Sequence, residues 1–165
     1  MTNNIKQALQ VLTALGFPRA QLNERSALCL LALLDLTHDK SWTHASAPLM
    51  GITPIMDWAR VNYKKRYAPN TRETFRRQTM HQFVDAGVAI YNPDDPARPV
   101  NSPHAVYQIE KEALTLLRTF GSAEWKKNLL AYLSKRPTLA EKNAKRRSLQ
   151  LIPVEIAPGR EIKLS

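Results

Sequence analysis

The sequence predicts a mainly helical fold that carries one small β-hairpin. Apolar residues recur at helical spacing through most of the chain, and this pattern favours helices over strands. Two short β-prone runs, 89–91 and 105–109, lie on either side of a segment with four prolines, which cannot form a core strand. A predicted helix over 70–85 comes directly before them. Helix, strand, loop and strand in this order are typical of a helix-turn-helix domain with a wing, here with additional flanking helices.

The first part of the chain is predicted to supply the core. Residues 4–15 have apolar side chains at helical spacing, and Gly16 ends this helix. Residues 22–36 are apolar almost all round, so they are predicted to form the core helix, entered through Asn23 or Ser26. The lone cysteine of the chain lies in this helix, where we expect it to pack as a small apolar residue without a disulfide.

The next two predicted helices form the helix-turn-helix. Thr53 is followed by proline, which is a common start of a helix, and this first helix is predicted to run to about residue 67. Its apolar residues Ile55, Trp58 and Val61 are expected to turn inward. A turn of about three residues then leads into the helix over 70–85, and two helices joined in this way form a helix-turn-helix.

The helix predicted over 70–85 has a packed face and a polar face. Asn70 and Glu73 are spaced as a capping box, and Gly87 follows the helix as a left-handed C-terminal residue. The apolar face is formed by Phe75, Met80, Phe83 and Val84. The opposite face carries hydrogen-bonding side chains and no carboxylate, and its members are Thr71, Thr74, Arg77, Gln78 and His81. Such a face is suited to reading base edges in the DNA major groove, with a merely solvated face as the alternative.

Two neighbouring arginines of this helix are predicted to have different roles. Arg77 and Gln78 are expected to discriminate bases, because arginine can bond twice to guanine and glutamine twice to adenine. Arg76 is expected to pack its stem toward the Phe83 side and to pair with a carboxylate or a phosphate.

The charge of the chain indicates an anionic partner. Lysine and arginine number 24 against 14 acidic residues, so the net charge is +10, which favours nucleic acid first and an anionic membrane surface second. Residues 60–77 hold seven cations and one anion, and residues 126–147 hold eight cations and one anion. A patched distribution suits phosphates, although a solvated helix face is the alternative for the second patch. The predicted phosphate-binding residues are Lys64, Lys65, Arg66, Arg72, Lys145, Arg146 and Arg147.

Other chemistry is sparse in the sequence. Neither a signal-peptide core nor an apolar run long enough to span a bilayer is present, so a soluble cytoplasmic protein is expected. The four histidines are scattered without zinc spacing, and no metal or cofactor site is predicted in this chain. Asp94 followed by Glu124-Trp-Lys126, or by Glu161-Ile-Lys163, resembles a nuclease pattern. We assign no catalytic residue, because Asp94 is predicted on a wing tip and Glu124 at a helix start.

Three further helices and a hairpin are predicted after the wing. One helix covers 111–120, and Ser122 and Thr138 are expected to cap the two that follow. The tail over 151–165 is predicted to form two short strands about a Pro158-Gly159 turn. A lone hairpin has little to pair with, so we interpret this tail as the opening of a further domain.

Three stretches of the sequence resemble one known family. They are TRETFRRQTMHQFVDAGVAIYNPDDPARPVNSPHAVYQI, ALTLLRTFGSAEWKKNLLAYL and IPVEIAPGREIKLS, and all are similar to the N-terminal region of the BsuBI/PstI type II restriction endonucleases. The resemblance implies a winged-helix DNA-binding domain, placed at 1–150, and a connector hairpin at 151–165. It also implies a nuclease domain with a Mg²⁺ site beyond this chain, and it allows a homodimer formed through the full-length enzyme.

Three functions are compatible with the sequence. The first is sequence-specific binding of double-stranded DNA as the recognition domain of a restriction endonuclease, without cleavage by this polypeptide alone. The second is a stand-alone winged-helix transcriptional regulator, which the same helix and wing would support. The third is a small complete nuclease, which metal-dependent cleavage by the pure chain would favour.

Overall fold

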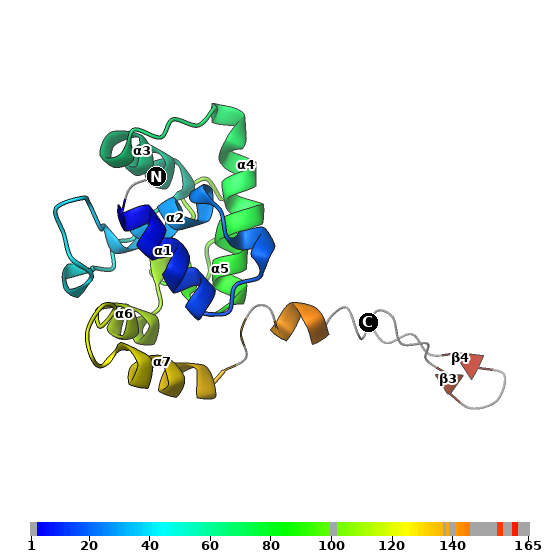
Figure 1. The fold of residues 1–165 in the computed structure, drawn as a ribbon. Helices are drawn as coiled ribbons and strands as arrows, with labels where there is room; N and C mark the ends of the chain where they lie inside the picture. The colour runs from blue at the N-terminus through cyan, green and yellow to red at the C-terminus, as the bar shows by residue number, and fades with distance from the viewer. Residues whose placement is uncertain are drawn as a thin grey trace.

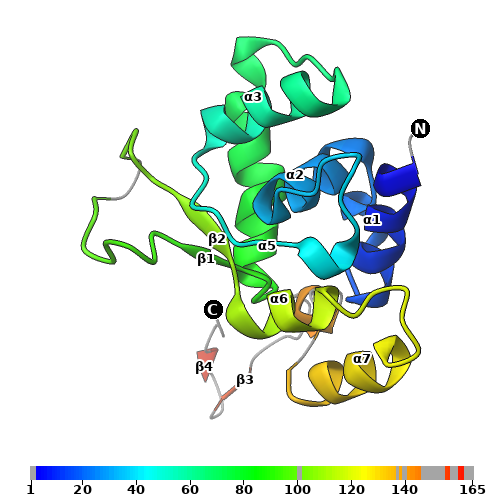
Figure 2. The ribbon, with the colours of Figure 1, turned by 90° about the vertical axis from the view of Figure 1, so that its left-hand side faces the viewer.

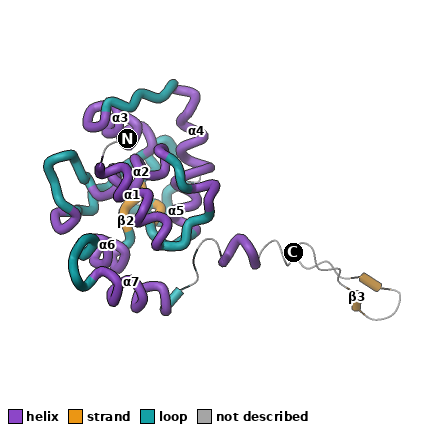
Figure 3. Tube along the Cα trace, in the orientation of Figure 1, coloured by secondary structure: helices purple, strands orange, loops and turns teal. Residues whose placement is uncertain are grey.

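Helices make up most of the structure, a computed structural model that describes residues 3–99, 102–136, 138 and 141–145, and the backbone of 155–156 and 160–161. Figure 1 shows the helices packed around one centre. An antiparallel two-stranded hairpin follows the fifth helix, α5, and Figure 3 separates helices, strands and loops by colour. The predicted fold class, mainly helical with a small hairpin, is confirmed.

The centre of the fold is helix α2 (Glu24–Leu34), against which α1 (Asn3–Ala14) packs. Every residue from Ser26 to Leu34 is buried. The Asn23 side chain accepts a hydrogen bond of 2.9 Å from the Ser26 backbone N–H and thereby caps α2. Burial raises the pKa of the Cys29 thiol, so this cysteine stays protonated and unreactive. The predicted core helix is therefore confirmed, with Asn23 as its cap.

Helix α3 (Ile52–Tyr63) starts and ends earlier than predicted. Gly51 is its N-cap, so Thr53 lies inside the first turn, and Lys64 stops the helix in a left-handed conformation with a φ of 57°. The prediction that Val61 turns inward is wrong, because its side chain is 58% exposed. The buried stripe of α3 runs along the opposite side and consists of Ile52, Ile55, Ala59 and Tyr63.

The connection from α3 to the next helix is longer than the predicted turn. It starts at Lys64 and ends at Ala68, the N-cap of the next helix. Tyr67 anchors the connection, since its ring packs edge-on against Phe75 with the centroids 4.9 Å apart. The two helices on either side of this loop form the helix-turn-helix.

The second helix of the pair is continuous over residues 69–85 and is called the 69–85 helix below. Its four segments are a 3₁₀ turn η3 (Pro69–Thr71), α4 (Arg72–Thr74), a π-helical segment η4 (Phe75–Met80) and α5 (His81–Asp85). No side chain caps its start, where Ala68 precedes a proline that is preorganised for the first helical turn. The predicted capping box of Asn70 and Glu73 is therefore wrong.

The π-helical segment changes which side chains turn toward the core. Phe75, Met80 and Phe83 are fully buried, as α-helical spacing predicts, and Val84 is partly buried against them. Thr79 is also fully buried, because π-type bonding from residue i to i+5 inserts one extra residue into the turn. Its hydroxyl accepts a hydrogen bond of 2.8 Å from Nε of Arg25 on α2, which gives the buried polar atom a partner.

The turns that end α1 and the 69–85 helix have the same geometry. Gly16 and Gly87 occupy them with left-handed φ angles of 83° and 76°. The closing N–H to O=C bonds, each 3.0 or 3.1 Å long, run from Gly16 to Thr13, Phe17 to Leu12, Gly87 to Val84 and Val88 to Phe83. Both sets follow the Schellman pattern, in which a glycine satisfies the last carbonyls of a helix.

The hairpin after the 69–85 helix is the predicted wing. Strands β1 (Ala89–Tyr91) and β2 (Tyr107–Ile109) pair antiparallel, with Tyr91 opposite Tyr107. Met50 adds a one-residue bridge to the other edge of β2, exchanging backbone hydrogen bonds of 2.9 and 2.8 Å with Tyr107. In the view of Figure 2 the wing extends to the side opposite α1. The bridge ties the wing to the segment that leads into α3.

The base of the wing is fixed by one buried amide. Asn92 is 2% exposed, and its side-chain oxygen accepts hydrogen bonds of 2.9 Å from the Val106 N–H and from the Arg98 guanidinium. Arg98 also donates to both carboxylate oxygens of Asp94 at 3.1 and 3.0 Å. Hydrogen bonding from Arg98 lowers the pKa of Asp94. The wing loop is therefore held in one arrangement at its base.

Helices α6 (Lys111–Leu117) and α7 (Trp125–Ser134) follow the wing. The Glu110 carboxylate caps α6 through bonds of 2.8 and 3.0 Å from the Glu112 and Ala113 N–H groups. Helix α6 ends before residue 120. Ser122 accepts a hydrogen bond of 3.2 Å from the Glu124 N–H, yet no side chain caps the first turn of α7. The predicted Ser122 cap is thus displaced to the turn before the helix.

A single arginine joins α6 to α7. The Arg136 guanidinium lies 3.4 Å from a carboxylate oxygen of Glu110 and 2.6 Å from one of Glu112. It also lies over the Tyr132 ring, 4.2 Å from the centroid.

Residues 141–145 form a further helical segment that returns to the end of the 69–85 helix. The Thr138 hydroxyl accepts a hydrogen bond of 3.2 Å from the Glu141 N–H, which confirms its predicted capping role. Lys142 donates through Nζ to the backbone oxygen of Asp85 at 2.6 Å.

The predicted tail hairpin is confirmed in the backbone. Strand β3 (Glu155–Ile156) pairs antiparallel with β4 (Arg160–Glu161). The Pro158-Gly159 turn lies outside the described residues. Across the part of the chain that the structure describes, no helix is both long and apolar enough to cross a membrane.

Candidate nucleic-acid interface

All five predicted base-reading residues lie on the 69–85 helix, and none of them is buried. Arg77, Gln78 and His81 are exposed, while Thr71 and Thr74 are half-buried. The Arg77 side chain is 73% exposed. Among the arginines for which an ion pair is described, this is the highest exposure. The five residues span more than two turns of one rigid element, whose opposite side is anchored in the core by Phe75, Met80 and Phe83.

The sequence prediction missed a carboxylate on this side of the helix. Glu73 accepts a hydrogen bond of 2.9 Å from Nε of Arg77 and one of 3.3 Å from Nε of Arg76. A terminal nitrogen of Arg76 also donates to the same carboxylate. These arginines, Arg76 first, lower the pKa of Glu73, and Glu73 raises the pKa of Arg76. The polar face therefore holds a three-residue charge cluster at its centre.

The predicted difference between the two arginines is visible in their exposure. The Arg76 side chain is 39% exposed, against 73% for Arg77. Arg76 pairs with a carboxylate, as its predicted role allows, and it lines the groove described next.

A groove separates the 69–85 helix from the wing. Its volume is about 270 Å³, and its lining residues are Ile52, Arg72, Glu73, Arg76, Tyr91, Ser102, Pro103, Ala105 and Tyr107. The Tyr91 and Tyr107 rings lie with centroids 5.2 Å apart, and burial raises the pKa of Tyr107 to about 12. The groove thus has arginines and a carboxylate on the helix side and neutral aromatic rings on the wing side.

A second, smaller cavity lies where α3 meets the start of the 69–85 helix. It encloses about 240 Å³ and is lined by Thr53, Met56, Asp57, Arg60, Arg66, Tyr67, Pro69 and Arg72. Nε of Arg72 donates to the Thr53 hydroxyl at 2.8 Å, which bridges the two helices. Arg66 and Arg72 were predicted from the charge pattern, whereas Arg60 joins them only through the fold.

The remaining predicted phosphate-binding residues differ in their exposure and in their ion pairs. Lys64 is exposed, but Lys65 pairs with Glu24 on α2 at 3.2 Å. Lys145 is exposed on the helical segment 141–145. Arg146 and Arg147 lie outside the described residues.

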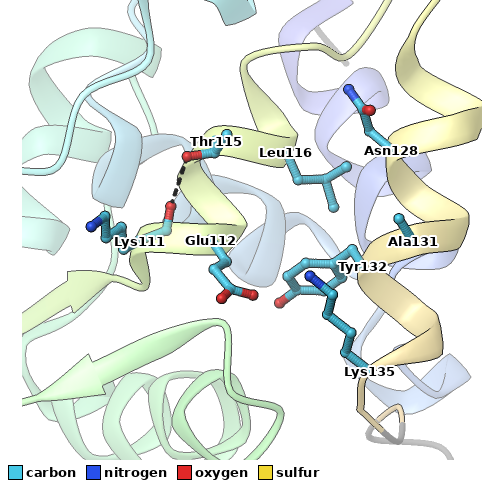
Figure 4. Close-up of a pocket in the computed structure, with 8 residues that line it drawn as sticks. All are labelled: Lys111, Glu112, Thr115, Leu116, Asn128, Ala131, Tyr132 and Lys135. Atoms are coloured by element: carbon cyan, nitrogen blue, oxygen red, sulfur yellow. Dashed lines mark hydrogen bonds between the residues drawn. The ribbon is translucent and has the colours of Figure 1, made fainter.

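A larger cavity than these two lies elsewhere, between α6 and α7. Its volume is about 410 Å³ and its lining residues are Lys111, Glu112, Thr115, Leu116, Asn128, Ala131, Tyr132 and Lys135. Figure 4 shows Leu116 and the Tyr132 ring toward the middle, with the Lys135 side chain extending toward that ring in this view and Lys111 at one margin. Glu112 forms an ion pair with Arg136. The arrangement is an open cleft between packed helices, without an assembled acid–base pair.

The residues of the nuclease-like pattern lie on separate elements. Asp94 is bound to Arg98 in the wing, and Glu124 is exposed at the start of α7. The side chains of Glu161 and Lys163 lie outside the described residues. Within the described part of the chain, no three His, Cys, Asp or Glu residues are grouped so that they could hold a metal ion.

Comparisons with known proteins agree with this geometry. A sequence profile described as the BsuBI/PstI restriction endonuclease HTH domain matches residues 2–141. The chain is 58% identical over 165 residues to the type II restriction enzyme BsuBI of Bacillus subtilis, covering 100% of this chain and 52% of that protein. It is 38% identical over 168 residues to the type II restriction enzyme AplI of Arthrospira platensis, covering 99% and 52%.

A solved structure is also similar. The SdaI restriction endonuclease aligns with a TM-score of 0.78 at 36% identity, over 98% of this chain and 50% of that one. The chain therefore spans about half the length of the relatives that it matches.

Proposed function

Because the chain belongs to the BsuBI/PstI restriction endonuclease HTH domain family, we propose that it binds double-stranded DNA sequence-specifically, as the N-terminal recognition domain of a type II restriction endonuclease. The observation that carries this proposal is the outward side of the 69–85 helix, where hydrogen-bonding and cationic side chains stand beside the wing. A helix of this kind enters the major groove, and flanking cations bind phosphates.

The contacts divide into base reading and positioning. Arg77 and Gln78, with Thr71, Thr74 and His81 beside them, read base edges in the major groove. The cavity between α3 and the 69–85 helix holds a backbone phosphate, to which Arg60, Arg66 and Arg72 contribute charge. Lys64 and Lys145 add exposed cations, and Lys65 joins only if it leaves Glu24.

The proposal assigns cleavage to a separate part of a longer protein. Residues 1–150 form the DNA-binding domain and 151–165 the connector, and a nuclease domain beyond the connector would bind Mg²⁺. This assignment is supported by the relatives, which are about twice as long as this chain. A homodimer would then form through the full-length enzyme.

The first test is binding without cutting. The purified chain is mixed with a randomised duplex library, bound DNA is selected and sequenced, and a plasmid carrying the selected site is incubated with the chain and Mg²⁺. We expect one enriched motif and a plasmid that stays supercoiled, because the described residues include no group of three acidic or other metal-binding side chains that could hold Mg²⁺. Double-strand breaks that vanish in Glu124→Ala would contradict the assignment, and a library without enrichment would contradict sequence-specific binding.

The second test compares two neighbouring arginines. Arg77→Ala should weaken binding to the selected site by about 1–3 kcal/mol and weaken binding to scrambled DNA much less. Arg76→Ala is the matched control, since its side chain is half as exposed and lines the groove beside the wing; it should weaken both DNAs alike. Titrations at one fixed salt concentration measure both variants. Equal losses on both DNAs for Arg77→Ala would mean that this arginine positions the helix and does not read bases.

A further inference from the structure

Glu73 is an unusual residue for a surface that faces DNA. It is the only acidic residue between Arg60 and Arg77, and its side chain is 55% exposed on the outward side of the 69–85 helix. A carboxylate at this position repels phosphates, so it weakens the general attraction on which DNA binding depends. Its position in the first turn of α4 and its pairs with Arg76 and Arg77 stabilise the helix, and its place at the centre of the cationic surface gives it a further effect on DNA binding.

The contacts of Glu73 suggest that function. One carboxylate oxygen receives Nε of Arg77 at 2.9 Å together with a terminal nitrogen of Arg76, and the other receives Nε of Arg76 at 3.3 Å. Glu73 and Arg76 also line the groove between the helix and the wing. In the free protein, Glu73 is therefore an internal anion for two guanidinium groups, that of Arg76, which lines this groove, and that of the neighbouring Arg77.

We propose that Glu73 is a specificity-determining residue, which is held in place by Arg76, withholds Arg77 from DNA phosphates and releases it only where a base amino group takes its place at the carboxylate. The inference rests on the proposed function. Random DNA presents phosphates to this surface, and a phosphate can bind Arg77 only by breaking its contact with Glu73 or by approaching the negative charge of Glu73. Both routes lower the affinity for random DNA.

The correct site offers the carboxylate a replacement donor. The amino group of cytosine or adenine projects into the major groove, and a glutamate can accept its hydrogen bond. Arg77 is then free to bond to a neighbouring guanine, while Glu73 keeps a partner. The penalty therefore falls on random DNA and is largely removed on the selected site, so that a repulsive element increases the ratio between the two affinities.

The test replaces the charge while keeping the shape. Glu73→Gln is compared with Glu124→Gln, which removes the same charge from an exposed position at the start of α7, away from the 69–85 helix. Both are titrated with the selected duplex and a scrambled duplex over a range of salt concentrations, and their melting temperatures are compared with that of the parent chain.

For Glu73→Gln we expect binding to scrambled DNA to become about 3–10-fold tighter near 0.1 M salt, because roughly one additional phosphate contact forms. The slope of log affinity against log salt on scrambled DNA should steepen by about 0.9. Binding to the selected site should change less, so the ratio between the sites falls. Glu124→Gln should leave that ratio unchanged, and Glu73→Asp, which keeps the charge, should restore part of it.

The outcomes separate this inference from the proposed function. If the parent chain prefers its selected site and Glu73→Gln keeps the parental ratio and salt slope, Glu73 has no role in specificity, while the proposed function stands. If the parent chain binds neither duplex, both fail. A second variant checks the mechanism: in an Arg77→Ala background, Glu73→Gln should no longer steepen the salt slope, and a slope that still steepens would overturn the withholding of Arg77.

Discussion

Phe83→Ala is expected to lower the free energy of unfolding by about 3–5 kcal/mol, the usual range for removing a buried aromatic ring. Phe83 has no exposed surface and packs edge-to-face against Phe17, with centroids 5.3 Å apart. Phe17 directly follows the turn that ends α1, so the ring pair joins the first helix to the 69–85 helix. Truncation removes this contact and leaves a cavity that rigid helices cannot fill.

The measurement is equilibrium unfolding in urea, followed by far-ultraviolet circular dichroism. Val84→Ala is the control, because Val84 is only partly buried on the same turn and its truncation should have a clearly smaller effect. Similar losses for the two variants would mean that Phe83 does not anchor the helix. The 69–85 helix carries the proposed DNA contacts. Phe83→Ala should therefore also weaken DNA binding at temperatures where a fraction of the molecules is unfolded.

Gly16→Ala is expected to destabilise the chain by about 2–5 kcal/mol, the sum of two effects. An L-residue in the left-handed conformation loses roughly 1–2 kcal/mol, and Gly16 has a φ of 83°. A Cβ at this position would also lie 2.4 Å from both Cβ and Cγ2 of Thr138, and crowding of this kind adds about 1–3 kcal/mol.

Gly87→Ala separates the two effects. Gly87 occupies the same Schellman turn with a φ of 76°, but nothing lies within 4 Å of an added Cβ. It should therefore show the conformational loss of about 1–2 kcal/mol alone. Thermal unfolding of both variants gives the difference, which reports the contact between the end of α1 and Thr138. An equal loss in both variants would show that Thr138 does not press on this turn in solution.

The sequence predicted those elements whose signals are local. Helix α2 could be located because its run of apolar residues and its Asn23 cap lie within one segment. The wing could be located because four prolines separate two β-prone runs. In each case the sequence pattern and the resulting structure depend on the same neighbouring residues, so contacts with distant parts of the chain do not change the prediction.

The errors arise where distant residues decide the outcome. Val61 has the right spacing for a core residue, yet α2 packs on the other side of α3 and leaves it exposed. The bridge of Met50 to Tyr107 joins residues far apart in sequence and leaves no periodic pattern. The anchoring of Lys142 on the Asp85 carbonyl similarly depends on a chain reversal that no single segment specifies.

The sequence indicated which residues belong to the candidate site, but it did not indicate how their side chains contact one another. None of the five proposed base-reading residues is buried, but Glu73 was assigned to a cap. The N-cap is Ala68, two residues before Asn70, and Pro69 occupies the first helical position, which removes the need for the predicted cap. The carboxylate is then free to bind Arg76 and Arg77, and a search for charged partners three and four residues apart would have found both pairs.

The π-helical segment affects any attempt to graft a new specificity onto this scaffold. A π turn is equivalent to a one-residue insertion into an α-helix, and one residue corresponds to a rotation of about 100°. Side chains before and after residues 75–80 therefore follow two helical phases. A donor helix with uninterrupted α-helical geometry, transplanted residue for residue, would direct the side chains of its C-terminal half about 100° away from the directions that this helix gives them. Retargeting should keep the segment 75–80 intact, including the buried Thr79 and its Arg25 partner, and vary only the outward positions.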